Sequence, residues 1–193
     1  MITRNLGYKM TSRDIKQLDE SDADKLFEDP FLVLSARNNI SAIQFLDKRI
    51  KEIEKAVKSH VRCKPEFKYL TTMPGIGDIL GLTIMLEVGD ISRFPTVGKY
   101  SSYCRCVKSE RLSNNKKKGE GNRKNGNKYL AWAYVEAANF ANRHYPEVQS
   151  FYNSKKAKKN GIVAIKALGN KLARASYYVM RDQVPYDARK LFK

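Results

Sequence analysis

The sequence has few of the residues from which metal centres and disulfide frameworks are built. Its 193 residues include only two histidines, His60 and His144, and three cysteines, Cys63, Cys104 and Cys106. Cys104 and Cys106 are one residue apart, too close for the usual pair of zinc ligands, and neither histidine is grouped with them. We therefore expect no metal site in this chain, and the odd, sparse set of cysteines indicates a reducing compartment.

Long apolar runs and targeting signals are also missing. No window approaches the roughly eighteen uncharged apolar residues of a membrane-spanning helix, and the opening MITRNLGYKM lacks the apolar core of a secretory signal. Hydrophobic residues nevertheless make up 42% of the chain and aromatic residues 10%, which is enough for a folded core. The sequence thus predicts a folded, cytoplasmic protein.

Acidic residues are scarce in the second half of the chain. The whole sequence has 37 Lys and Arg against 20 Asp and Glu, a net charge of +17, and residues 99–193 alone hold 22 basic and 6 acidic residues. Because a field of one sign opposes compaction, a polyanion is the natural partner. The simpler alternative is a solvated basic surface that keeps the protein soluble. A membrane surface is disfavoured, since few apolar residues accompany the basic ones.

Helical periodicity dominates the chain and no internal repeat is evident, so we expect an all-α protein. Residues 31–64 are predicted to form an amphipathic, coiled-coil-like helix, because apolar residues recur at spacings of three and four at Ile43, Leu46, Ile50, Ile53 and Val57. This seam covers about two heptads, which leaves pairing with a second copy and packing on the rest of the chain equally open. Residues 1–30 are expected to be a residual linker segment, and residues 65–193 a C-terminal domain.

A glycine-containing turn interrupts the helical pattern of residues 67–88. The sequence Pro74-Gly75-Ile76-Gly77 joins two short predicted helices, as in a helix-hairpin-helix motif. In such a motif glycine allows the tight turn, and free N–H groups at the start of the second helix can face a phosphate. Gly75, Ile76 and Gly77 are therefore candidate nucleic-acid-binding residues. The same letters also fit a plain corner between two core helices.

The segment 108–128 changes character abruptly. It has eight basic and two acidic residues, five Asn, three Gly and a single apolar side chain, Leu112. It cannot contribute a core and is expected to be a surface loop or hairpin that suits a phosphate backbone, with Asn127 as the cap of the next helix. Ser109 and Ser113 supply its only hydroxyls. With no histidine nearby in sequence to act as a base, a solvated serine is the simpler interpretation of either one.

Several of these features occur together, in order, over roughly residues 65–185. They are the Pro-Gly-Ile-Gly turn, Gly89-Asp90 followed by Arg93-Phe94, the Tyr-Cys stretch, the basic loop and Gly126-Asn127-Lys128-Tyr129-Leu130. The segment resembles the C-terminal transposase domain of the insertion-sequence family that includes the Piv and MooV DNA invertases. In that family the resemblance implies an N-terminal RuvC-like domain whose four acidic residues hold Mg²⁺, a helical coiled-coil linker and this C-terminal domain. In several members a structured noncoding RNA guides the choice of DNA.

The resemblance also implies roles for single residues. Ser113 matches the serine that attacks the DNA phosphodiester, although Asn114 stands where many relatives have Gly; asparagine also tolerates left-handed backbone angles. Ser109 matches less well. The basic residues expected to hold DNA or guide RNA around the scissile phosphate are Lys116, Lys117, Lys118, Arg123, Lys124 and Lys128.

What precedes the predicted long helix is too short for a RuvC-like domain. Such a fold needs roughly a hundred residues of alternating strands and helices, and only about thirty are present. Asp19 and Asp22 have a D-x-x-D spacing, but we interpret them as surface acids at a helix start, because two carboxylates alone hold a hard cation poorly. We expect a truncated reading frame or a fragment of a transposase that is inactive without the acidic domain. A non-catalytic nucleic-acid-binding protein is the alternative, and a protein that oligomerises through residues 31–60 is the third.

Overall fold

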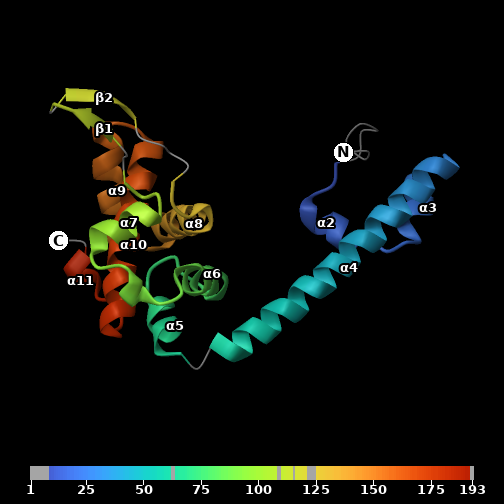
Figure 1. The fold of residues 1–193 in the computed structure, drawn as a ribbon. Helices are drawn as coiled ribbons and strands as arrows, with labels where there is room; N and C mark the ends of the chain where they lie inside the picture. Colours follow the sequence, from blue (N-terminus) through green and yellow to red (C-terminus); the bar gives the residue numbers. More distant parts are fainter. Residues whose placement is uncertain (1–8, 62–63, 108–109, 115, 121–124, 192–193) are drawn as a thin grey trace. The chain divides into compact units, whose positions relative to one another are not determined.

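The computed structural model describes residues 9–61, 64–107, 110–114, 116–120 and 125–191 (Figure 1). The chain divides into two units, Met1–Lys58 and Ser59–Lys193, and each is described by itself. Helices account for nearly all the regular structure in the described residues, and strands occur there only as one two-stranded hairpin. The prediction of an all-α protein is therefore confirmed. None of the described helices is both long and apolar enough to cross a membrane.

The N-terminal unit consists of two short helices beside a long one. Helices α2 (Ser12–Gln17) and α3 (Asp22–Leu26) precede α4 (Pro30–Val61), whose first residue is a proline that suits a helix start. The segment expected to be a residual linker contains two short helices. Side chains of α4 hold the preceding segment, since Arg37 Nη2 donates to both carboxylate oxygens of Asp24 and Gln44 Nε2 donates to the carbonyl of Leu18 at 2.8 Å.

The C-terminal unit is built around its longest helix. Its elements are α5 (Pro65–Leu70), α6 (Asp78–Val88), the 3₁₀ turn η1 (Ile91–Arg93), α7 (Val97–Tyr103), β1 (Glu110–Ser113), β2 (Lys116–Glu120), α8 (Lys128–His144), α9 (Pro146–Lys158), α10 (Gly161–Asp182) and α11 (Ala188–Leu191). Helix α10 packs against α5, α7, α8 and α9 (Figure 1). Small side chains let α8 approach closely: its alanines at 133, 137, 138 and 141 are fully buried.

Buried hydroxyl groups tie three of these helices together. The hydroxyls of Tyr100 on α7 and Tyr134 on α8 are hydrogen-bonded at 2.5 Å, and Tyr134 is in turn hydrogen-bonded to Ser176 on α10 at 2.5 Å. Ser176 also donates to the carbonyl of Ala173 at 2.9 Å. Burial raises the pKa of both tyrosines well above the ordinary value, so both hydroxyls stay protonated. A buried polar chain in which each member has a partner fixes the relative positions of these helices.

Candidate nucleic-acid interface

The basic segment forms an antiparallel hairpin at one end of the C-terminal unit. Strand β1 pairs with β2 so that Ser113 lies opposite Lys116 and Arg111 opposite Gly119. The register shifts between Arg111 and Leu112, which makes Lys118 the extra residue of a bulge. The sequence prediction of a surface loop or hairpin is borne out for the described part, and a bulge in a short ribbon increases its local twist.

Ser113 is the last residue of β1 and is exposed. Asn114, which follows it, has φ 52°, the left-handed region in which Asn replaces Gly at modest cost. Lys116 and Lys118 are exposed as well. Cations beside an exposed hydroxyl can stabilise negative charge that develops on a phosphate. The geometry therefore leaves the serine accessible, and the strand pairing places Lys116 opposite it.

Some of the candidate residues lie outside the described part of the chain. These are Ser109, Arg123 and Lys124, and for Lys117 the backbone but not the side chain is described. Lys128 is the first residue of α8, and its ammonium lies 4.9 Å from the ring centroid of Tyr129. His60 lies in α4 and His144 ends α8, roughly 24 Å along that helix from Lys128.

The end of the hairpin is clamped to the helical body through Gly126 and Asn127. Asn127 N donates to the carbonyl of Tyr103 at 2.7 Å, and its side-chain oxygen accepts from Tyr129 N and Leu130 N as the cap of α8. Its Nδ2 donates to Glu87 at 2.5 Å. The predicted cap is thus confirmed, and the same side chain also binds the last turn of α6.

Arg105, two residues after the end of α7, completes this clamp. Its Nε and Nη2 both donate to the carbonyl of Gly126, at 3.0 and 2.8 Å. Gly126 has φ 93°, and a Cβ there would lie 2.4 Å from the carbonyl oxygen of Tyr103. The sequence did not reveal the roles of Arg105 and Glu87, because each lies far along the chain from the residue that it binds. The Gly-Asn pair before a helix was the one local signal.

The two described cysteines precede the hairpin in the chain and are poor nucleophiles. Cys104 is fully buried, and burial raises the pKa of its thiol above the usual range. Burial also raises the pKa of Cys106 to about 12. At neutral pH both are therefore thiols rather than reactive thiolates. Asn170 of α10 donates to the carbonyl of Cys106 at 3.1 Å and so attaches the entry of the hairpin to the core.

The glycine turn between α5 and α6 is shaped by packing. Gly75 has φ 79°, and a Cβ there would lie 2.1 Å from the carbonyl oxygen of Ala137 on α8. The side chain of Ile76 is buried, with 3% of its surface exposed. Gly77 is the N-cap of α6 and has open space around its Cβ position. Close approach of this turn to the backbone of α8 thus explains Gly75 without a ligand. Any contact from Ile76 to nucleic acid would have to come from its backbone.

The glycine turn and the hairpin lie at opposite ends of α6 and α8. Glu87 at the end of α6 binds Asn127 at the start of α8, whereas Gly75 before α6 meets Ala137 further along α8. Ten residues of helix separate positions 127 and 137, or about 15 Å. The structure therefore does not bring the two predicted sites together.

Asp19 and Asp22 cap the start of α3. Asp19 accepts hydrogen bonds from the N–H and hydroxyl of Ser21, and Asp22 accepts from Asp19 N at 3.0 Å and from Lys25 at 2.9 Å. The Ser21 bond lowers the pKa of Asp19, and the Asp19 N–H lowers that of Asp22. The interpretation of both as helix-start surface acids is confirmed. Across the described part of the chain no cluster of three or more His, Cys, Asp and Glu could hold a metal.

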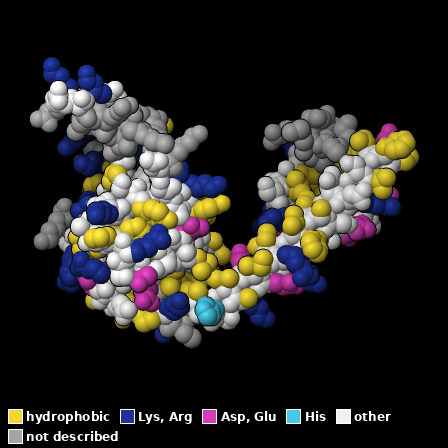
Figure 2. Space-filling view, in the orientation of Figure 1, with side chains coloured by type: hydrophobic (Ala, Val, Ile, Leu, Met, Phe, Trp, Pro, Cys, Tyr) yellow, Lys and Arg dark blue, Asp and Glu magenta, His cyan; other side chains and the backbone are white. Residues whose placement is uncertain are grey.

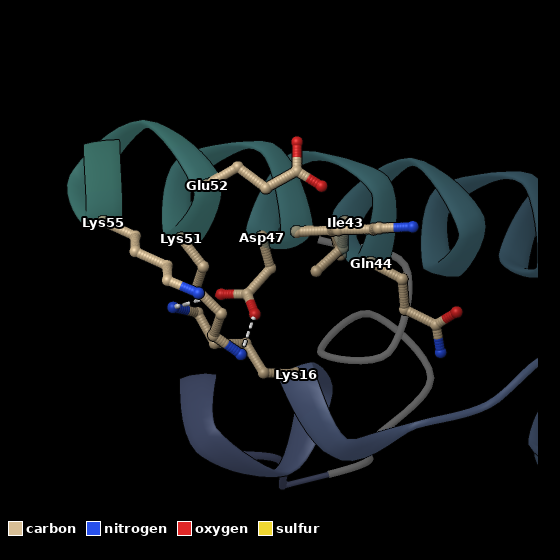
Figure 3. A pocket seen from close by; sticks show the side chains of 8 residues that line it. Lys16, Ile43, Gln44, Asp47, Lys51, Glu52 and Lys55 are labelled. Atoms are coloured by element: carbon tan, nitrogen blue, oxygen red, sulfur yellow. Dashed lines mark ion pairs between the residues drawn. The ribbon is translucent and has the colours of Figure 1, made fainter. Parts of the chain in front are cut away.

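An open groove between α2 and α4 belongs to the N-terminal unit (Figure 3). Asp47 is central there, with ion pairs to Lys51 at 2.6 Å and to Lys16 at 3.9 Å. The hydrogen bond from Lys51 holds the pKa of Asp47 below its usual value. Exposed pairs of this kind contribute little free energy. The groove is best explained as the surface on which α2 lies, and we assign no ligand to it.

The segment that contains this hairpin is similar to known proteins of insertion elements. Residues 67–153, from α5 into α9, match the model of the transposase IS116/IS110/IS902 family. The chain is 23% identical over 150 residues to an uncharacterized 43.6 kDa protein of insertion element IS110 from Streptomyces coelicolor, an alignment that covers 77% of this chain and 37% of that protein. It is 24% identical over 123 residues to an uncharacterized 44.8 kDa protein of insertion element IS116 from Streptomyces clavuligerus, which covers 64% of this chain and 30% of that protein.

The matched segment includes the hairpin and the features on either side of it. The glycine turn, the buried tyrosines, the hairpin with Ser113 and the Asn127 clamp all lie between residues 67 and 153. The chain spans about a third of the length of the curated relatives. Helices α6, α7 and α8 and the hairpin that connects α7 to α8 thus lie in the part of this chain that matches a transposase domain of the IS116/IS110/IS902 type, whereas α10 lies outside it.

Proposed function

We propose that this chain is the serine-bearing part of a DNA transposase and that its hairpin acts on a DNA phosphodiester. The observation that carries the proposal is the family match over residues 67–153, which includes the exposed Ser113 and the lysines beside it. Phosphoryl transfer to a serine needs an accessible hydroxyl, cations around the phosphate and a base. The hairpin supplies the first two.

The proposed step is a transesterification. The Oγ atom of Ser113 forms a bond to phosphorus, one P–O bond to a deoxyribose breaks, and the released deoxyribose oxygen takes up a proton. The proton of the serine hydroxyl passes to a base outside the described residues. Rejoining to another strand reverses the step, so that no water and no oxidant is consumed.

The described carboxylates do not fit the Mg²⁺ that the family resemblance implies. Asp19 and Asp22 are engaged in the start of α3, and Asp47 is paired with lysines. We therefore assign the metal to the RuvC-like domain that the resemblance implies in addition to this chain, and we route no step through it. Guide RNA, where one is used, would occupy the same basic surface.

Salt dependence of binding tests the nucleic-acid part of the proposal. For this chain with a labelled duplex, with and without Mg²⁺, we expect the logarithm of affinity to fall against the logarithm of salt with a slope of about −5 or steeper, as for six or more phosphate contacts. Replacing Lys116, Lys117 and Lys118 with Gln should reduce the steepness by about 2 to 3, since each lost contact on duplex DNA is worth ~0.9.

A matched variant separates this effect from a general loss of charge. Lys48, Lys55 and Lys68 are exposed lysines of α4 and α5, and their replacement with Gln removes the same charge. We expect the slope of this variant to stay close to that of the unmodified chain. Absent binding, or a slope that is flat with salt, would show that the basic half is only solvated and would contradict the proposal.

We also propose that α4 pairs with α4 of a second copy. The face that carries Arg37 and Gln44 contacts α2 and α3, while Leu46, Ile50 and Ile53 on the opposite face are more than half exposed. Apolar residues at spacings of four and three on an exposed helix face are typical of a coiled-coil seam.

Light scattering after size exclusion tests this pairing. We expect a dimer for the unmodified chain, and a monomer when Ile50 and Ile53 are replaced by Glu, because two like charges would face each other across the seam. Replacing the exposed Lys48 and Lys55 with Glu is the matched control and should leave the mass unchanged. A strict monomer of the unmodified chain would rule the pairing out.

A further inference from the structure

A second concentration of positive charge lies on α9 and α10. From Val148 to Arg181 the sequence has no Asp or Glu and eight basic residues, Lys155, Lys156, Lys158, Lys159, Lys166, Lys171, Arg174 and Arg181. The first five are exposed and lie within about two helical turns of the connection between α9 and α10. We refer to these five, Lys155, Lys156, Lys158, Lys159 and Lys166, as the α9–α10 lysine cluster.

Like charges are crowded where the two helices meet. The ammonium of Lys155 on α9 lies 5.5 Å from the ring centroid of Phe151, and that of Lys171 on α10 lies 4.9 Å from the same ring. Burial, and then the charge of Lys155, lower the pKa of Lys171. Crowding of this kind costs free energy in the isolated protein and is offset when an anion binds.

The cluster lies at the same end of the C-terminal unit as the hairpin. Gln183, just past the last residue of α10, binds Glu66 of α5. Asn170, in the middle of α10, binds the carbonyl of Cys106. The first residue of α10, Gly161, lies about 14 Å from Asn170 along the helix, on the side away from Gln183. Strand β1 of the hairpin begins four residues after the same Cys106. Figure 1 shows β1, β2 and the connected ends of α9 and α10 at this end, and in Figure 2 Lys and Arg outnumber Asp and Glu over the visible face of the unit.

We propose that the α9–α10 lysine cluster is a second phosphate-binding element, which grips the sugar–phosphate backbone of the same nucleic acid that the hairpin contacts. This inference rests on the proposed function and adds a surface to it. Lysine binds phosphate as a point charge, and a row of exposed lysines with no Asp or Glu between them in the sequence matches the regular negative charge of a nucleic-acid backbone.

Phosphodiesters fit this surface better than a lipid headgroup does. Residues 153–158 of α9, Asn-Ser-Lys-Lys-Ala-Lys, contain no large apolar side chain that could enter a bilayer. At the start of α10, Ile162 is 72% exposed and Val163 39% exposed, and two adjacent side chains provide little area for anchoring. An anionic vesicle is therefore an arm of the test rather than the expected partner.

The test replaces Lys155, Lys156, Lys158 and Lys159 with Gln in the full chain. We expect the salt slope for duplex DNA to become less steep by about 3 to 4, since each contact is worth ~0.9, and affinity at physiological salt to fall at least tenfold. Structured RNA is the second arm, and it shows whether the cluster serves DNA, RNA or both. Replacing Lys48, Lys55, Lys64 and Lys68 with Gln removes the same charge elsewhere and should leave both slopes unchanged. Circular dichroism checks that each variant is folded.

The outcomes separate this inference from the proposed function. If the hairpin variant loses affinity while the α9–α10 variant keeps both slopes, the cluster does not touch nucleic acid and only this inference fails. If the unmodified chain binds neither nucleic acid, the proposed function itself fails. Vesicles containing phosphatidylserine that bind the unmodified chain but not the α9–α10 variant, with unchanged binding of nucleic acid, would assign the cluster to a membrane and overturn the inference. A less steep salt dependence of affinity in both the hairpin variant and the α9–α10 variant, measured on the same duplex, supports the inference.

Discussion

Replacing Ser113 with Ala is expected to abolish covalent protein–DNA adducts while leaving DNA binding within a few-fold. The substitution removes the Oγ atom that the proposed transesterification needs, and no described thiol can replace it, because burial keeps Cys104 and Cys106 protonated. Binding should survive, since Ser113 is exposed at the end of β1 and the lysines around it keep their charge. A change from detectable adduct to none is the largest effect on chemistry that we expect.

The measurement is the yield of labelled DNA that remains attached to protein after denaturing electrophoresis. It uses this chain joined to the N-terminal region of a full-length relative, because the proposed base and metal lie there. Ser109→Ala is the matched control and should keep its adducts. Adducts that persist in the Ser113→Ala variant and vanish in the Ser109→Ala variant would show that the wrong serine was assigned. Strong binding without any adduct in the unmodified protein would instead favour the non-catalytic alternative.

Among the glycines that the structure describes, replacing Gly75 with Ala should cause the largest loss of stability. The new Cβ would lie 2.1 Å from the carbonyl oxygen of Ala137 and 2.9 Å from the backbone N of Ala141, so that the backbone of α8 would have to move. Overpacking costs about 1–3 kcal/mol, and φ 79° adds roughly 1–2 kcal/mol for a residue with a side chain. We expect the free energy of unfolding to fall by about 3 kcal/mol or more.

Urea unfolding followed by circular dichroism measures this loss, and Gly77→Ala is its control. Gly77 lies two residues away in the same turn, has φ −89° and has nothing within 4 Å of its Cβ position. Its replacement should cost less than about 1 kcal/mol, the usual effect at a helix N-cap. If the two variants unfold at similar urea concentrations, the packing explanation of Gly75 is wrong. A role of the turn in phosphate binding would then deserve the same salt titration as the hairpin.

The turn also shows where sequence reasoning left alternatives open. Pro-Gly-Ile-Gly fits both a phosphate-binding hairpin and a corner between core helices, because glycine serves both. Ala137, the group that explains Gly75, is some sixty positions away in the chain, and no local pattern reveals it. The basic segment was easier to interpret, because eight basic residues with one apolar side chain have no place in a core, and its described part forms a surface hairpin.

Of the two roles of Asn127, the sequence predicted only the cap of α8. Asn before an apolar helical pattern is a known start signal, and Asn127 does cap α8 through Tyr129 N and Leu130 N. Its second role, the bond from Nδ2 to Glu87, joins residues forty positions apart. The α9–α10 lysines were visible only as a basic run, since their nearness to the hairpin depends on how α10 passes α7.

By itself, the sequence determined the all-helical class, the position of the basic hairpin, the cap at Asn127 and the resemblance to a transposase domain. These properties depend on periodicity, composition and residues close together in the chain, which a sequence displays directly. Only the tertiary structure decided that the glycine turn lies a helix length away from the hairpin and that the α9–α10 lysine cluster lies at the same end as Ser113. Both facts follow from which helices pack together, and that choice is made by contacts such as Tyr100 with Tyr134 and Asn170 with Cys106, between residues dozens of positions apart.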